Sequence, residues 1–390
     1  MRPVPAPARP RFRVVVAGAG IAGLEALLAL RELAGDRVAL TLLEPRAELA
    51  LAAFEPAALL AGDAPLHVPI ATVAERAEAE VVRSPLERVD PDARTAHTEA
   101  GDAIGYDALL VAVGARPSAG VRGALTWWPG ADHAEFARLT ADAEEGEAGR
   151  IAFIVPSRYA WPLPAYELAL LTARRLEEHG RRADLLLVTP EPKPLAVVGP
   201  VGSAAVLAEL DAAGIAFAGG AVGAVRGGAQ PAVEVWPRSR RFPVDRVVSL
   251  PRAWGPRVDG LRADVEGFLF ADELGRLRGT PGVWAIGDAT HRLPRHGGLA
   301  ALQADAAARD IAATAGALVV ARTYSPLLRA QLRTGLGRLW LQRDLSDPFD
   351  AGIASDHALW APPAKIAARR LGALLAQPEA PDGLRLSLAR

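Results

Sequence analysis

The stretch that decides the fold lies close to the N-terminus and reads Arg13-Val-Val-Val-Ala-Gly-Ala-Gly-Ile-Ala-Gly-Leu24. An apolar strand is expected over residues 13–17, followed by three glycines and a helix-like stretch over residues 24–33. A second apolar strand is expected over residues 38–43, and it ends at Glu44. Strand, glycine turn, helix, strand and terminal acid together form the βαβ pattern that binds a dinucleotide.

Each residue type in this unit has a physical role in holding a dinucleotide. Gly18 permits the tight turn, and Gly20 lets the backbone approach the pyrophosphate. Gly23 allows close helix–strand packing, so that the helix N-terminus faces the phosphates. Glu44 is expected to accept hydrogen bonds from the adenosine ribose hydroxyls, which disfavours a 2′-phosphate there. The other expected contact residues of the turn are Ile21 and Ala22.

The composition limits the class of protein. The chain has 390 residues, 51% of them hydrophobic, which is enough for two or three domains at about 150 residues each. Its 44 basic and 45 acidic side chains argue against a dedicated nucleic-acid binder, which would need a basic face. Cysteine is absent, which excludes disulfides, thiolate metal sites and a cysteine nucleophile. The seven histidines show no metal-ligand spacing, so no metal site is expected.

Two further segments indicate which dinucleotide is bound. Residues 280–288 read as an apolar strand that ends in Gly287 and Asp288, and residues 106–117 contain a buried strand that ends at Gly114. With the first glycine turn, these segments resemble the signature segments of the pyridine nucleotide–disulfide oxidoreductases. Members of that family are flavoproteins with two dinucleotide-binding domains, and the signature segments occur here in the family's order.

The resemblance implies a tightly bound, non-covalent FAD. In that family the aspartate of the Gly-Asp pair accepts a hydrogen bond from the flavin ribityl chain, which is the role implied for Asp288. The family's Ala-Thr-Gly segment is represented by Ala112, Val113 and Gly114, where valine replaces threonine and one polar contact is lost. The strand over residues 86–90 resembles the one whose backbone meets the adenine, at Leu86.

A long alanine-rich helix is expected to begin within residues 293–303. In the family, the N-terminus of this helix points at the pyrimidine edge of the flavin and tunes its potential. Leu299 completes the implied cofactor-binding residues. His296 and Gln303 are candidates for the flavin face, although a capped and packed helix explains them at least as well. No residue is assigned a catalytic role.

The middle of the chain keeps the expected strands and helices but lacks the second glycine turn. Strands are expected over residues 150–155 and 183–189, with a helix from Tyr166 between them. The connection before that helix reads Pro156-Ser-Arg-Tyr-Ala-Trp-Pro-Leu-Pro164 and contains no glycine. Proline has no N–H, and the bulky side chains obstruct a phosphate. Losing two charge-assisted hydrogen bonds, at roughly 1.5–3 kcal/mol each, would weaken NAD(P)H binding by about two to four decades.

The degenerate loop and the Thr189-Pro-Glu-Pro192 turn most resemble the sulfide:quinone reductase and flavocytochrome sulfide dehydrogenase branch of the family. Those enzymes handle sulfide with paired cysteines. Because this chain has no cysteine, that mechanism and any dithiol relay are excluded, and only the flavin is left to carry electrons. Gly199 and Gly202 open a further helix, and we favour a plain loop over a minor anion site there.

Residues 321–390 are expected to form a helical C-terminal segment. Residues 332–345 read as helical, and so do residues 360–375, where prolines stand at the expected start. Quinone-linked members of the family rest on membranes through such amphipathic helices. The apolar face of the second helix is modest and Arg370 interrupts it, which favours packing against the flavin domain or a dimer partner.

The expected fold is α/β, with two Rossmann-like domains and the helical C-terminal segment. A split FAD-binding domain covers residues 1–120 and 245–320, and residues 121–244 form an inserted, degenerate NAD(P)-binding-like domain. The expected function is an FAD-dependent oxidoreductase that passes two electrons through the flavin without cysteine chemistry and without conventional NAD(P)H binding. Two alternatives stay open. One is an NAD(P)H:quinone or other acceptor reductase, similar to type II NADH dehydrogenases, and the other is a non-catalytic flavin-binding or assembly protein.

The expected partner is an electron acceptor of unidentified kind, whether a small molecule, a quinone or a protein, and the chain is expected to form a homo-oligomer. No apolar stretch reaches the roughly 20 residues needed to span a bilayer, and residues 1–11 lack the apolar core of a secretory signal. The expected location is therefore the cytoplasm. Peripheral contact with the inner face of the membrane through the C-terminal helix stays open.

Overall fold

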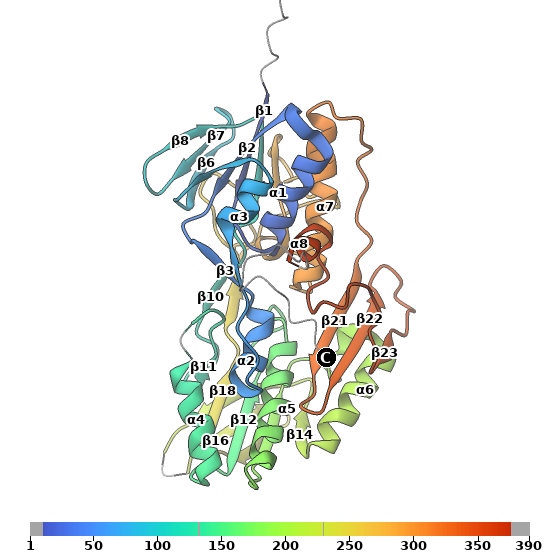
Figure 1. The fold of residues 1–390 in the computed structure, drawn as a ribbon. Coiled ribbons are helices and arrows are strands. Elements are labelled where there is room, and N and C mark those ends of the chain that lie inside the picture. The colour runs from blue at the N-terminus through green and yellow to red at the C-terminus, as the bar shows by residue number, and fades with distance from the viewer. Residues whose placement is uncertain (1–10, 132, 229, 376–390) are drawn as a thin grey trace, which may run out of the picture.

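The computed structural model describes residues 11–131, 133–228 and 230–375. Two α/β units lie one above the other, and the C-terminal strands lie beside the lower one (Figure 1). The upper unit is built on a five-stranded parallel sheet in the order β20-β9-β1-β2-β5. Its strands are β1 (Phe12–Ala17), β2 (Val38–Leu43), β5 (Ala79–Val82), β9 (Ala108–Val111) and β20 (Val283–Ala285). The first βαβ unit therefore forms where the sequence predicts it.

Strand β1 serves two separate apolar cores. Val14 and Val16 point to the face covered by helices, whereas Val15 and Ala17 point to the face covered by an antiparallel sheet. This follows because successive side chains of a strand point to opposite faces. The helices are α1 (Ile21–Ala34), α3 (Ile70–Arg76) and α7 (Gly297–Thr314), and the antiparallel strands are β6 (Leu86–Asp90), β7 (Thr95–Thr98) and β8 (Ala103–Gly105). A parallel sheet buried on both faces needs apolar residues throughout, as this one has.

The middle unit repeats this layered plan. Its parallel sheet has the order β11-β18-β12-β13-β14, with helices on one face and an antiparallel meander on the other. The sheet strands are β11 (Leu125–Thr126), β12 (Arg150–Ile154), β13 (Asp184–Val188), β14 (Ile215–Ala218) and β18 (Arg246–Ser249). The helices are α4 (Ala134–Glu145), α5 (Leu163–Glu178) and α6 (Gly199–Ala212), and the meander is β15 (Val222–Arg226), β16 (Ala232–Trp236) and β17 (Arg240–Pro243).

The two units are joined by a pair of antiparallel strands, β10 (Arg116–Ser118) and β19 (Arg252–Trp254). Because β18 still belongs to the middle sheet, the chain returns to the first unit after Ser249 and not at residue 245 as expected. Helix α2 of the first unit packs against α5 of the middle unit. It belongs to a short segment made of β3 (Glu48–Ala50), α2 (Glu55–Leu60) and β4 (His67–Pro69). The two units are therefore held together by the contact between α2 and α5 as well as by the β10–β19 strand pair.

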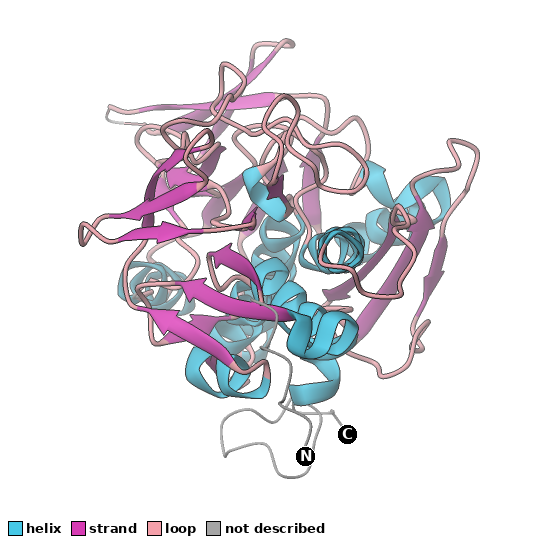
Figure 2. Ribbon diagram, turned by 90° about the horizontal axis from the view of Figure 1, so that it is seen from above, coloured by secondary structure: helices cyan, strands magenta, loops and turns pink. Residues whose placement is uncertain are grey.

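The expectation of a helix over residues 332–345 is wrong. Strands β21 (Leu327–Arg333), β22 (Arg338–Asp344) and β23 (Ile353–Ser355) form an antiparallel sheet. Leu328, Ala330 and Leu332 alternate with less buried residues and pack onto the helices of the middle unit. In Figure 2 this sheet stands at the right-hand edge, with helices between it and the other strands. The leucine spacing suits a helix only if the turn Thr334-Gly-Leu-Gly337 is included in the element, and in the structure this turn separates two strands.

The second C-terminal helix is shorter than predicted. Only α8 (Arg369–Leu375) is helical, and residues 360–368 run in turns and extended backbone. Side-chain bonds hold this stretch open: Trp360 Nε1 donates to the Ala364 carbonyl, and Lys365 pairs with a distant carboxylate. Leu371 of α8 is buried in the core of the first unit. The apolar side of α8 therefore covers its own chain, the packing that the sequence analysis favoured over membrane contact.

Among the described residues, no helix is both long and apolar enough to cross a membrane. Residues 1–10 and 376–390, which the expected domains included, lie outside the described ranges.

Candidate functional site

Three glycine-bearing segments meet at the carboxyl ends of the first parallel sheet. A Cβ placed on Gly18 would lie 2.5 Å from the carbonyl oxygen of Ala112, and one on Gly287 would lie 3.2 Å from the Cβ of Ala22. Gly18 has φ +99°, a conformation that side-chain-bearing residues rarely adopt. The segment ending at Gly114 and the Gly-Asp segment therefore both lie against the first glycine turn, although 90 residues and more separate them in the sequence.

The glycine turn has the shape of a phosphate cradle. A Cβ on Gly23 would lie 1.9 Å from the carbonyl oxygen of Gly18, so α1 begins in direct contact with the turn. Gly20, by contrast, has open space within 4 Å of its Cβ position. The open space lies at the start of α1, where the N–H groups and the positive helix end face a bound anion. This geometry fits the pyrophosphate of FAD.

Glu44 braces this turn with a buried carboxylate. Oε2 accepts hydrogen bonds from the Ala19 N–H at 2.7 Å and Arg46 Nη2 at 3.0 Å, and Oε1 accepts from Arg46 Nε at 2.8 Å and the Arg46 N–H at 3.0 Å. Burial acts to raise the pKa of Glu44, but these bonds outweigh it and hold the pKa below its ordinary value. Four donors fill the roughly four acceptor positions of a carboxylate. A ribose hydroxyl must therefore displace one of the Arg46 bonds.

Two residues predicted to contact the cofactor, Leu86 and Leu299, pack into apolar cores of the protein. Leu86 begins β6 beside an irregularity in the strand pairing and packs against the core under the antiparallel sheet. Leu299 is buried in the core of the middle unit, and its N–H donates to His296 Nδ1 at 3.4 Å. That N–H is engaged within the protein and is not presented to a flavin. Gln303 is also structural, because its Oε1 accepts from the Gly287 N–H at 2.7 Å.

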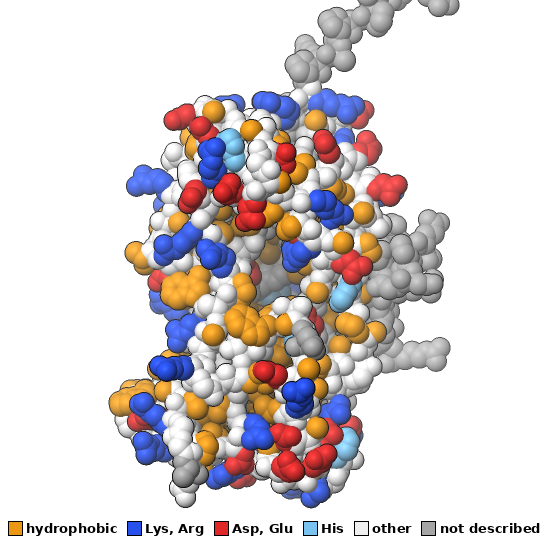
Figure 3. Space-filling view, turned by 90° about the vertical axis from the view of Figure 1, so that its left-hand side faces the viewer, with side chains coloured by type: hydrophobic (Ala, Val, Ile, Leu, Met, Phe, Trp, Pro, Cys, Tyr) orange, Lys and Arg blue, Asp and Glu red, His pale blue; other side chains and the backbone are white. Residues whose placement is uncertain are grey.

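A cavity of about 450 Å³ lies between the two units and is the site where the chemistry is expected. One face of the molecule is hollowed at this level (Figure 3). The first unit contributes Ile21, Asp288 and Gly297 to its lining, and the middle unit contributes Tyr159 and Trp161. No hydrogen bond to the Asp288 carboxylate exists within the described ranges, and burial raises its pKa against the opposing effect of Arg295. An unpartnered carboxylate at this place fits the hydroxyl donors of a ribityl chain.

Arg295 is a second buried charge at this cavity. Its side chain is stacked on the Phe268 ring at 3.8 Å from the ring centre, and on the Tyr159 ring at 5.5 Å. Burial lowers the pKa of its guanidinium, while Asp288 acts to raise it. The sequence analysis did not single out this arginine, because its burial depends on contacts with segments far away in the chain.

A buried ion pair on the cavity wall was also missed from the sequence. Lys365 Nζ lies 2.6 and 2.7 Å from the two oxygens of Glu167, and both side chains line the cavity. Burial lowers the pKa of Lys365 and raises that of Glu167, and each charge offsets the effect on the other. The sequence feature that could have drawn attention to this residue is the rarity of lysine, because Lys365 is one of only two lysines in the chain.

The loop that replaces the second glycine turn is packed with side chains. The Tyr159 ring stacks on Phe268, and the Trp161 ring meets the His296 ring edge-on at 5.0 Å. The acid that follows β13, Glu191, is turned inward, and its Oε2 accepts hydrogen bonds from Tyr166 Oη at 3.1 Å and Thr189 Oγ1 at 3.2 Å. A second dinucleotide would need exposed backbone N–H groups in this loop for its pyrophosphate and a free Glu191 carboxylate for its ribose.

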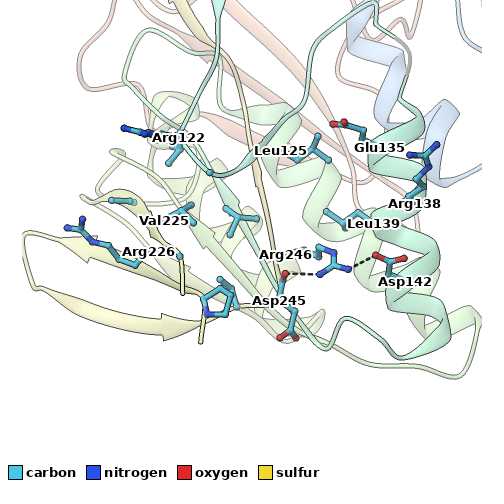
Figure 4. Close-up of a pocket in the computed structure, with 18 of the residues that line it drawn as sticks. Arg122, Leu125, Glu135, Arg138, Leu139, Asp142, Val225, Arg226, Asp245 and Arg246 are labelled. Atoms are coloured by element: carbon cyan, nitrogen blue, oxygen red, sulfur yellow. Dashed lines mark hydrogen bonds and ion pairs between the residues drawn. The ribbon is translucent and has the colours of Figure 1, made fainter. Parts of the chain in front are cut away.

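A separate cavity, of about 940 Å³, lies in the middle unit between α4 and the β15–β17 meander (Figure 4). Arg246 crosses it to Asp142 at 2.7 Å. None of the site residues predicted from the sequence lines this cavity. Within the described part of the chain, no three His, Asp or Glu side chains are grouped to hold a metal ion.

Comparisons with known proteins agree with this architecture. Residues 12–155 match the family model of the pyridine nucleotide-disulphide oxidoreductases. The sulfide-quinone reductase of Aquifex aeolicus (strain VF5) is 27% identical over 186 residues, which are 46% of this chain and 43% of that relative. The sequence match thus spans less than half of that curated relative's length.

Solved structures share the fold over most of the chain. The sulfide:quinone oxidoreductase from Aquifex aeolicus has a TM-score of 0.79 at 19% identity, with 88% of this chain and 86% of that one covered. A ferredoxin reductase from Rhodopseudomonas palustris has a TM-score of 0.65 at 19% identity, with coverage of 84% and 81%. Residues 12–155 therefore match the family model of the pyridine nucleotide-disulphide oxidoreductases, and the fold of these FAD-binding proteins is shared over most of the chain.

Proposed function

We propose that this chain is an FAD-dependent oxidoreductase that passes two electrons through a non-covalent flavin, without cysteine chemistry and without conventional NAD(P)H binding. When bound, FAD supplies the redox chemistry, and the protein supplies placement, electrostatics and exclusion of water. The observation that carries the proposal is the open glycine cradle beside Gly20, paired with a middle unit whose corresponding loop has no glycine and carries the stacked rings of Tyr159 and Trp161.

The glycine turn and the residues that line the cavity have distinct roles in this proposal. The turn at Gly18 and the N-terminus of α1 hold the pyrophosphate, and Asp288 accepts a hydrogen bond from the ribityl chain. Tyr159 and Trp161 keep water from the middle-unit side of the cavity. Lys365 Nζ holds a proton at the cavity wall, where Glu167 keeps it in place.

The acceptor we propose is a quinone or another small aromatic molecule. The cavity is lined mainly by apolar and aromatic groups, among them Leu49, Trp127 and Trp161, which suit an aromatic ring. The sulfide-quinone reductase relative supports this class of acceptor, whereas its sulfide half-reaction has no counterpart in a chain without cysteine.

Anaerobic mixing of the holoprotein with NADH or NADPH tests the proposal directly. We expect the flavin absorbance to persist at micromolar nucleotide and to bleach with dithionite, which shows that the flavin is reducible. The same assay then screens quinols, sulfide and reduced ferredoxin as donors. Rapid bleaching by NADH or NADPH would contradict the proposed role of the Pro156–Pro164 loop.

A second candidate is an NAD(P)H:acceptor reductase that binds the nicotinamide through an unusual loop. The observation in its favour is that the cavity beside Tyr159 and Trp161 is open and has room for a donor. A non-catalytic flavin-binding or assembly role would be favoured instead if the flavin stayed oxidised with every donor in the screen.

A further inference from the structure

Arg295 is a buried cation that forms no ion pair with any carboxylate of the described residues. Its exposed fraction is 6%, and Nη1 and Nη2 donate only to the carbonyl oxygens of Tyr159 and Thr290, each at 3.3 Å. Nε is buried without any hydrogen-bond partner. Among the described residues, no carboxylate oxygen lies within 4.0 Å of its guanidinium. Because isolated buried charges are strongly unfavourable, such an arginine is expected to pair with an anion that comes from outside the chain.

This arginine lines a second, smaller cavity as well as the larger one. The smaller cavity has a volume of about 380 Å³ and lies between the loop after β12 and the turn before α7. Its walls are mainly apolar, with Val155, Trp161 and Pro294 among them, and Arg295 lies where the two cavities adjoin. The volume suits a small molecule and is at the low end of the range for ligand pockets.

The remaining polar groups of the smaller cavity leave room for an anion. Arg158 is exposed at the rim and bonds to Tyr159 Oη at 3.2 Å. Glu191 is the cavity's acid, but Tyr166 and Thr189 already occupy its carboxylate, and burial raises its pKa to about 7. The lining therefore offers one buried cation and apolar walls, and the carboxylate of the opposing acid already accepts hydrogen bonds within the protein.

The phosphate cradle and Arg295 lie on different segments of the first unit. The cradle is at Gly20, at the start of α1, whereas Arg295 stands on the turn before α7. The charge of Asp288 acts to raise the pKa of Arg295, but in the described part of the molecule the two side chains form no ion pair. A negatively charged group bound in the smaller cavity could form the ion pair that Arg295 lacks.

We propose that the cavity between the Pro156–Pro164 loop and the turn at residues 293–295 binds a small molecule with an apolar body and a carboxylate or similar oxyanion head, which pairs with Arg295. The inference deepens the proposed function, on which it rests, by naming the chemical class of molecule that enters beside the flavin. Binding itself needs no turnover, so it is measurable on its own.

Benzoate and benzamide provide a matched pair of probes, because they share the ring and differ in charge. We expect benzoate to raise the melting temperature of the holoprotein and to perturb the flavin absorbance bands. Benzamide is expected to bind at least 10-fold more weakly. Removing the guanidinium in Arg295→Met should weaken benzoate binding roughly 10- to 100-fold, the range for a lost charge-assisted hydrogen bond.

Two further variants control for folding and for general charge. Arg295→Lys keeps the cation and should retain part of the affinity for benzoate. Arg292→Met removes a guanidinium from the same turn, one that bonds to Glu273 and the Ala271 carbonyl and lines neither cavity. Its benzoate affinity should match that of the wild type.

Equal binding of benzoate and benzamide would overturn the inference, even if Arg295→Met fails to fold. So would unchanged benzoate binding in a folded Arg295→Met variant. A shift of the flavin midpoint potential in that variant, with no response of the wild type to benzoate, would instead assign Arg295 to the flavin and reject the anion site. If the purified protein binds no FAD, the proposed function fails, while the thermal shift still decides whether the anion site exists.

Discussion

Lys365 Nζ lies 2.6 and 2.7 Å from the two carboxylate oxygens of Glu167, a residue 198 positions earlier in the chain. Oε1 of Glu167 also accepts the N–H of Arg333 at 2.9 Å. One buried carboxylate thus joins α5 of the middle unit, the end of β21 and the stretch that precedes α8. Because the pair also lines the larger cavity, the C-terminal segment both closes the molecule and forms part of its candidate site.

Breaking this ion pair should be strongly destabilising. Lys365→Met leaves the Glu167 carboxylate buried without its cation, which should lower the free energy of unfolding by about 3–5 kcal/mol. The double variant Lys365→Met with Glu167→Leu removes both charges and should recover most of that loss. Urea denaturation measures both. Lys193→Met, which removes the other and exposed lysine, should stay within about 0.5 kcal/mol of the wild type. A double variant as unstable as the single one would contradict this view of the pair.

Two glycines of the first turn should respond in different ways to the same added methyl group. In Gly23→Ala, the Cβ would lie 1.9 Å from the Gly18 carbonyl oxygen, so the turn must shift and the protein should be destabilised even without FAD. In Gly20→Ala, the Cβ enters open space, so the FAD-free protein should keep its melting temperature. FAD should nevertheless bind more weakly, because the methyl group occupies the space of the pyrophosphate. Unchanged FAD affinity in Gly20→Ala, measured by fluorescence titration, would place the phosphates elsewhere.

Neighbouring arginines of α8 should differ sharply in their importance. Arg370 is buried and bonds to Glu32 through Nε at 2.7 Å and to Asp305 through Nη1 at 2.7 Å. Arg369 is exposed and reaches Glu32 only at 4.0 Å. Arg370→Met should therefore lower the free energy of unfolding by about 3–5 kcal/mol, whereas Arg369→Met should change it by less than about 1 kcal/mol. Equal effects of the two substitutions in chemical denaturation would refute the proposed docking of α8.

Glu191 should make the protein less stable as the pH rises from mildly acidic to neutral. Burial raises its pKa to about 7, from an ordinary value of 4.5. Between these values the folded chain binds a proton that the unfolded chain releases, so the free energy of unfolding falls as the pH rises through this window. The loss is at most about 3 kcal/mol and is complete above pH 7. Glu191→Gln should abolish this contribution when unfolding is compared at pH 5 and pH 8. An unaltered pH slope in the variant would show that Glu191 is ionised in the folded protein.

His296 should have the opposite effect on stability, making the protein less stable as the pH falls. Burial lowers its pKa to about 4, from an ordinary value of 6.5, which agrees with its neutral Nδ1 accepting a hydrogen bond at the start of α7. Between pH 6.5 and 4 the unfolded chain binds a proton that the folded chain does not, so stability falls as the pH falls. His296→Gln should flatten the acid side of the stability profile. A double variant with Glu191→Gln separates the two windows, and a profile still steep below pH 6.5 in His296→Gln would argue against a neutral, buried imidazole.

The elements that could be predicted from the sequence are those whose pattern is local. The first βαβ unit, with Gly18, Gly20 and Gly23 at its turn, lies where the residues place it, because glycine spacing and apolar strands specify backbone geometry within one short stretch. The sequence pattern predicts a helix in place of the C-terminal sheet because the spacing of Leu332 and Leu339 suits either structure, whereas in the fold the two residues pair across a hairpin.

The sequence by itself determined the dinucleotide-binding turn, the parallel sheets around it and the absence of cysteine chemistry. Within the described part of the chain, only the tertiary structure decided which charges face the site: Arg295 without an ion-paired carboxylate, Asp288 without a hydrogen-bond donor, and Lys365 against Glu167. The physical reason is that local patterns follow from backbone geometry over a few residues, whereas the burial and pairing of a side chain depend on which distant segments the completed fold brings against it.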